Sequence, residues 1–135
     1  MAFDQTLTTQ AKLVALQALA TGTLKMALYT GNASLNASTL AYTTANEVVG
    51  TGYTAGGNVV TGVTVLTSGT TAYLDFDNVV WNPANFTARG ALIYNTSLSN
   101  LAVAVLDFGA DKTTTTTFTV QTPANTADAA LIRFA

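Results

Sequence analysis

The sequence predicts an all-β protein, a jelly-roll-like antiparallel β-sandwich of seven or eight strands with one N-terminal α-helix. After residue 22, apolar and polar residues alternate in short segments, and turn-forming residues separate these segments at intervals of about 8 to 15 residues. Threonine, a favourable strand residue, occurs 26 times among 135 residues. This length suits one domain. We therefore expect an arm and helix over 1–21 and a β-sandwich over 22–135.

The helix is expected over residues 5–20, where leucines recur every three residues. Thr8 or Thr9 is suited to cap its start, and Gly22 to end it. The apolar run that ends at Ala18-Leu19-Ala20 is similar to a signal peptide. The segment before it has no net positive charge, however, so we interpret it as a retained amphipathic helix.

The residues before this helix, from Met1 to about Gln10, are polar and rich in threonine. Their aromatic residue, Phe3, belongs to no helical or strand repeat. We expect this segment to be an arm or docking element outside the β core, with Phe3 at an interface.

The first strand is predicted over 24–29, where Leu24, Met26 and Leu28 alternate with smaller or more polar residues, as in a half-buried strand. Residues 31–57 have no clear period and predict a long excursion with a short helical turn near Thr44 to Val48. Strands then recur at the spacing of hairpins. The later strands are predicted at 58–66, 70–76, 79–81, 87–94, 101–108, 113–121 and 129–134.

The composition excludes several classes of function. The chain has no cysteine and no histidine, which excludes disulfides, thiolate metal sites and the usual Ser-His-acid triad. Five basic residues against seven acidic ones leave a net charge of −2, so we expect no nucleic-acid partner. No apolar run approaches the ~20 residues of a membrane span. We expect no cofactor and no membrane partner.

Asp75 and Asp77 are the carboxylate pair that most resembles a catalytic or cation site. Two residues apart on a strand, they face the same side while Leu74 and Phe76 face inward. Neighbours on one strand do not straddle a substrate as the carboxyls of a glycosidase do. Calcium binding and simple solvation remain the alternatives, and solvation is the favoured one.

Arg89 lies in an otherwise apolar strand, and two interpretations of it stay open. Arginine is enriched at interfaces, so Arg89 is a candidate interface residue. It is equally suited to pair with Asp75, Asp77 or Asp107 within the fold. Asp107, together with Asp111 and Lys112, is interpreted as part of a solvated turn that keeps two strands in register.

The tyrosines Tyr42 and Tyr53 are candidates for an interface or for stacking on a sugar. Trp81 fits the core of a sandwich better. The glycine-rich segment 50–57 lacks the lysine and the following helix of a phosphate-binding loop, and is therefore expected to be a loop rim.

The scarcity of charge is the first indication of an assembly component. Charged residues make up 9% of the chain, where about 25% is usual. An interface of about 800 Å² per partner would therefore cover only one or two charges. Burying this surface removes few charges from water, so its desolvation penalty is small.

Four segments, spread over much of the chain from residue 22 onward, resemble small virion structural proteins of tailed bacteriophages. The matching segments are Gly22-Thr-Leu-Lys-Met-Ala-Leu-Tyr-Thr30, Glu47-Val-Val-Gly-Thr-Gly-Tyr-Thr-Ala-Gly-Gly57, Phe86-Thr-Ala-Arg-Gly-Ala-Leu-Ile-Tyr-Asn95 and Ala104-Val-Leu-Asp-Phe-Gly109.

The resemblance implies a capsid decoration (cement) protein with a jelly-roll-like fold, made in the host cytoplasm and located on the capsid exterior. Its expected partners are the major capsid protein and further copies of itself, as a dimer or trimer. No functional residue is carried over from the family. The alternative is a receptor- or carbohydrate-binding β-sandwich module of a tail fibre or secreted protein, and an enzyme is not expected.

Overall fold

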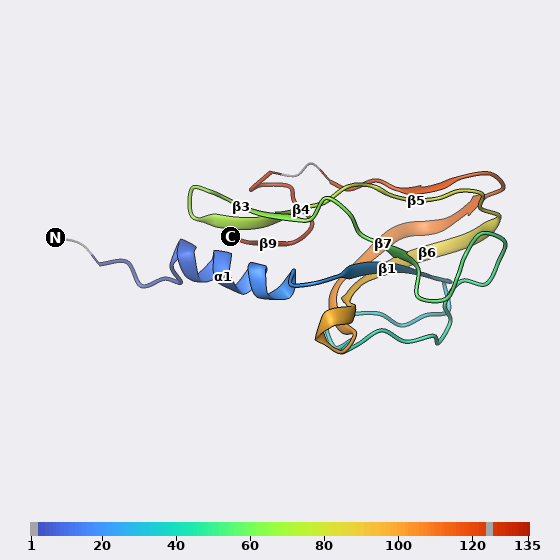
Figure 1. The fold of residues 1–135 in the computed structure, drawn as a ribbon, viewed down its shortest axis with the longest axis horizontal. Helices are drawn as coiled ribbons and strands as arrows, with labels where there is room; N and C mark the ends of the chain where they lie inside the picture. The colour runs from blue at the N-terminus through green and yellow to red at the C-terminus, as the bar shows by residue number, and fades with distance from the viewer. Residues whose placement is uncertain (1–2, 124–125) are drawn as a thin grey trace.

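The computed structural model describes residues 3–123 and 126–135, and its fold is mostly antiparallel β-structure with one α-helix (Figure 1). Helix α1 and the three-stranded sheet lie at one end, and the longest strands lie at the other. The helix is α1 (Thr9–Leu19), and a 3-10 turn, η1, covers Thr96–Leu98. The strands are β1 (Leu24–Tyr29), β2 (Asn58–Val59), β3 (Thr64–Ser68), β4 (Thr71–Asp75), β5 (Val79–Trp81), β6 (Phe86–Asn95), β7 (Leu101–Thr114), β8 (Phe118–Val120) and β9 (Arg133–Phe134).

The strands form three sheets with the orders β2-β1-β6-β7, β3-β4-β9 and β5-β8. The pairs β4–β9, β5–β8 and β6–β7 are all antiparallel and are nested within one another along the chain. The chain therefore runs outward through β4, β5 and β6 and returns beside itself through β7, β8 and β9.

Helix α1 begins at Thr9, later than the expected start at residue 5. Its cap is Thr8, one of the two predicted candidates, whose side chain accepts a hydrogen bond from the Ala11 N–H at 3.2 Å. At its other end, the buried Asn95 side chain donates to the Leu19 and Thr21 carbonyls. The helix packs on β3 and β4 through Leu16, which is 1% exposed. Its Lys12 side chain is also buried, and Nζ donates to the Thr70 carbonyl at 2.7 Å.

The main core lies between the four-stranded sheet and the β5–β8 pair. Trp81 and Phe86 both pack on Phe118 there, with ring centroids 6.2 and 5.2 Å from that of Phe118. Trp81 is 2% exposed, which confirms the expectation that it belongs to the core.

The alternation predicted that β1 is half-buried, but side chains on both of its faces are buried. Ala27 and Tyr29 are as buried as Leu24 and Leu28, because the long segment between β1 and β2 covers the second face of the sheet. That segment contains turns but no helix near Thr44 to Val48, so the expected helical turn is wrong.

The predicted strand 58–66 is divided between two sheets, since β2 pairs with β1 while β3 pairs with β4. The predicted strand break near residue 109 is also misplaced. Strand β7 continues to Thr114, and its residues between Asp107 and Lys112 bulge away from β6 opposite Arg89. These residues are a bulge within one strand, not a turn between two strands.

Candidate interaction surface

The N-terminal arm, which we define as residues 3–8, lies outside the β core. All six residues are exposed, and Phe3 is 90% exposed. Figure 1 shows the arm extending from the far end of α1, away from the sheets. This placement agrees with the expectation of an arm for these residues, while Met1 and Ala2 lie outside the described residues.

A groove of about 640 Å³ opens between the edge strands β7 and β8. Both strands end their sheets, so the edge of each that faces the groove has no paired strand in the described part of the chain. The start of β7 is covered, because the Ala102 N–H donates to the Leu40 carbonyl. The apolar residues that line the groove are Val105, Leu106, Phe108, Phe118, Val120, Pro123 and Leu131.

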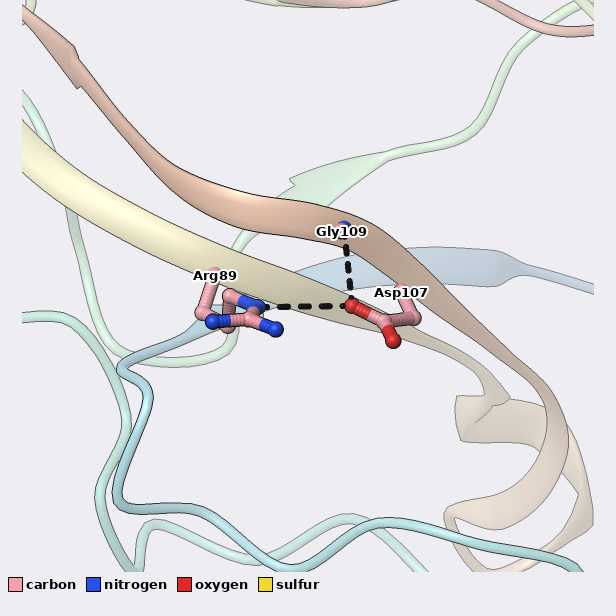
Figure 2. Close-up of polar contacts among 3 residues, drawn as sticks. All are labelled: Arg89, Asp107 and Gly109. Atoms are coloured by element: carbon pink, nitrogen blue, oxygen red, sulfur yellow. Dashed lines mark hydrogen bonds and ion pairs between the residues drawn. The ribbon is translucent and has the colours of Figure 1, made fainter.

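Arg89 pairs with Asp107 across the β6–β7 bulge, with 3.5 Å between Nε and Oδ1 (Figure 2). The Gly109 N–H donates to the same carboxylate at 2.8 Å. This N–H, followed by Arg89, lowers the pKa of Asp107 below its usual value. Of the two interpretations of Arg89, the pairing with Asp107 is therefore present. The Arg89 and Asp107 side chains are 43% and 74% exposed, so the pair lies at the surface and is accessible to an interface partner.

The tyrosines Tyr42 and Tyr53 do not form an exposed platform. Both are half-buried, and their hydroxyls donate to the two carboxylate oxygens of Glu47 at 2.7 and 2.5 Å. The Gly56 N–H donates to Glu47 as well, at 2.8 Å. Glu47 is 8% exposed, so its carboxylate is buried and held by three donors.

Two more tyrosines complete this group, which we call the Glu47 cluster: Glu47, Tyr29, Tyr42, Tyr53, Tyr94 and Gly56. Tyr42 stacks on Tyr94 with ring centroids 4.6 Å apart, and the Tyr94 hydroxyl donates to the Gly56 carbonyl. Burial raises the pKa of Tyr29 to about 12 and is also the main cause of the raised pKa of the other three. These phenols therefore remain hydrogen-bond donors in alkaline solution.

Asp75 and Asp77 flank the buried Phe76, as predicted, and Leu74 is buried as well. Asp77 accepts a hydrogen bond from the Thr61 hydroxyl at 3.1 Å. Across residues 3–123 and 126–135, no three side chains of His, Cys, Asp or Glu are grouped so as to hold a metal ion. The same described ranges contain no helix with the length and hydropathy of a membrane span.

Comparison with known proteins identified no matching family model, no similar curated protein and no similar solved structure.

The sequence interpretation missed the Glu47 cluster and the groove. Glu47 is the only glutamate of the sequence and lies within residues 31–57, which show no clear period. Tyr42 and Tyr53, on either side of it in the sequence, were interpreted as exposed rings. The signal was available in the tyrosines themselves, because a phenol in a mostly apolar domain needs a hydrogen-bond partner when buried. The groove had no local signal, since its walls come from strands that are not paired with each other.

Proposed function

We propose that this protein is a structural component of a tailed-phage virion that binds the capsid exterior and bridges neighbouring capsomers. It acts through contact area and shape, and it has no catalytic activity of its own. Its partners are the major capsid protein and further copies of itself. The resemblance of four segments to small virion proteins supports the class, and the surface of the molecule supports the mode of action.

The observation that carries the proposal is a surface poor in charge and rich in exposed apolar side chains. The accessible surface is 7477 Å², and of the few charged residues Lys12 and Glu47 are buried. Contact with a protein shell therefore displaces little bound water from charges. The large exposed hydrophobic residues are Phe3, Leu7, Val14, Leu40, Val49, Val59, Leu66, Val80, Leu98, Leu101 and Phe134.

The strand order supports a jelly-roll-like assignment within this proposal. Three nested antiparallel pairs along the chain are what a long two-stranded ribbon produces when it wraps into a sandwich. Such folds recur in viral shell proteins, although fold alone never fixes function.

The test is binding to mature shells of the phage that encodes the chain, prepared without this protein. We expect saturable occupancy at lattice sites and better survival of the shells on heating. Occupancy should change little between low and molar salt, because few ion pairs are available to screen. A variant with Val49→Asp and Leu40→Asp, both at highly exposed positions, tests whether the apolar surface carries binding.

Absence of binding to the shell, together with tight binding to a host-surface glycan, would overturn the proposal and favour a receptor module. Turnover of a glycan or ester that is lost in an Asp75→Asn, Asp77→Asn variant would overturn the non-enzymatic part. Both aspartates lie at the end of a hairpin strand, so neither change removes a core side chain.

A further inference from the structure

We propose that the N-terminal arm of one copy adds as a strand to the groove between β7 and β8 of a second copy. This inference rests on the self-association included in the proposed function and names the two surfaces that carry it. Exposed strand edges are templates for pairing with another chain, and natural proteins usually block them with charge, proline or a covering segment.

The β7 edge lacks such protection along one stretch that precedes the bulge. From Val103 to Leu106 it carries no proline and no charged residue. The floor of the groove beside it is apolar, since Leu106 and Phe108 from β7 lie near Phe118 from β8. A groove with these walls is suited to an extended segment that carries apolar side chains on one face.

The arm has this pattern. In an extended chain, side chains alternate between two faces, so Phe3 and Leu7 point to the same side, while Asp4 and Thr6 point to the other. Both apolar residues are exposed in the isolated copy, and binding in the groove would cover them. Threonine is also well suited to an added strand.

The charges of the two surfaces are complementary. The arm carries Asp4, and Lys112 lines the groove. Asp107 is the other charged residue of the groove lining, and it is already paired with Arg89. Within the described ranges, Lys112 has no ion pair, which leaves it available to Asp4.

The occupant must come from another copy because of where the arm lies. Helix α1 carries the arm away from the four-stranded sheet, and the β5–β8 region lies toward the other end of the molecule (Figure 1). An extended arm of six residues reaches about 20 Å. The 11 residues of α1 already add about 16 Å between the arm and β1, the strand that follows the helix. Two copies that insert their arms into each other form a dimer. Copies that each insert an arm into the next copy form a closed ring.

The absence of cysteine allows a direct test. Two full-length variants, Leu7→Cys and Thr119→Cys, are purified separately, mixed and treated with a short flexible bismaleimide. Thr119 lies on β8 and lines the groove. We expect a covalent pair that contains one chain of each variant. In the matched control, Leu40→Cys replaces Leu7→Cys at another highly exposed leucine, and we expect little product.

Sedimentation then measures the contribution of each side chain. Phe3→Ala with Leu7→Ala should weaken self-association about tenfold or more, whereas Val14→Ala, at an exposed position on α1, should leave it unchanged. Asp4→Lys and Lys112→Glu should each weaken it by up to about fivefold, and their combination should restore it.

Three results would overturn the inference: a monomer at all concentrations, cross-linking no stronger than in the control, or a cross-link within one chain when Leu7→Cys and Thr119→Cys are combined in the same chain. If one of these results is obtained while the protein still binds shells, the proposed function stands and the arm exchange alone is refuted. If the arm exchange occurs without shell binding, the proposed function fails alone.

Discussion

The two faces of the β1–β6 pair are covered in different ways. One face packs Met26 and Ile93 against the aromatic core around Trp81. The other face packs Ala27 and Leu92 beneath the Glu47 cluster, which the segment between β1 and β2 contributes in part. The first contact depends on apolar area, whereas the second depends on hydrogen bonds to one carboxylate. Their stabilities should therefore respond differently to truncation and to pH.

The largest effect is expected for the apolar face. Trp81→Ala removes a buried indole and should lower the free energy of unfolding by about 3 to 5 kcal/mol. Trp81→Phe keeps an aromatic ring in the site and should cost clearly less. Urea denaturation followed by circular dichroism measures both. Equal losses for the two variants would show that ring packing is not what stabilises this face.

The next effect is expected at Glu47. Glu47→Ala leaves the hydroxyls of Tyr42 and Tyr53 and the Gly56 N–H without their acceptor and should cost about 2 to 4 kcal/mol. Glu47→Gln keeps one acceptor oxygen, so a smaller loss is expected. The same denaturation measurement applies, with Asp111→Ala as the control at an exposed carboxylate. A loss at Glu47 no greater than at Asp111 would contradict the assignment.

The third prediction concerns alkaline pH. Below pH 10 the cluster tyrosines are protonated in the folded and unfolded chains. Above it, the unfolded chain loses protons that the folded protein keeps, because burial raises the pKa of Tyr29 to about 12 and that of the other three as well. Stability should fall between pH 10 and 12, by up to about 1.4 kcal/mol per pH unit for each tyrosine. Unfolding free energies across this range, compared with Tyr29→Phe, should show a shallower slope in the variant.

A smaller effect is expected where α1 meets the β3–β4 hairpin. Lys12→Met keeps the apolar stem but removes the hydrogen bond to Thr70, so we expect a loss of about 1 to 2 kcal/mol. Lys25→Met, on β1 away from α1, provides a control at a half-buried lysine. Protection of the α1 amides from hydrogen exchange should fall in the first variant and persist in the second.

The smallest effect is expected for the arm. Deleting residues 2–7 should leave the melting temperature nearly unchanged, since the described residues of this segment are all exposed. Thr8, which caps the helix, is kept. Differential scanning calorimetry measures this, and a collapse of the isolated domain would show that the arm belongs to the core.

The contrast between the two faces also explains what the sequence could predict. The alternation of Leu24, Met26 and Leu28 correctly predicted the face toward Trp81, because a two-residue period follows directly from strand geometry. The same pattern assigned Ala27 and Tyr29 to solvent. That error arose because an aperiodic segment covers them, and no local period encodes such a cover.

Strand ends were predicted less well for a similar reason. Gly109 was interpreted as a turn, yet β7 passes it through a bulge and pairs with β6 again at Lys112. Glycine is common in turns and in bulges, so only the register of the partner strand distinguishes them. The burial of the candidate interaction residues likewise depends on whether their contacts are local or distant in the sequence. Phe3 has no local repeat and is exposed, as expected for an arm, while its place at an interface stays a prediction. Tyr42 and Tyr53 were wrongly interpreted as exposed rings because both bind the carboxylate of Glu47.

The central proposal, that this protein belongs to a tailed phage and binds the exterior of its capsid, is tested most directly by a density map of that phage's native virion. We expect β-sandwich density at regular lattice sites on the outer shell, between neighbouring capsomers, with an extended arm that reaches an adjacent copy. Density for this chain at the tail or its fibres, or none on the shell, would contradict the claim.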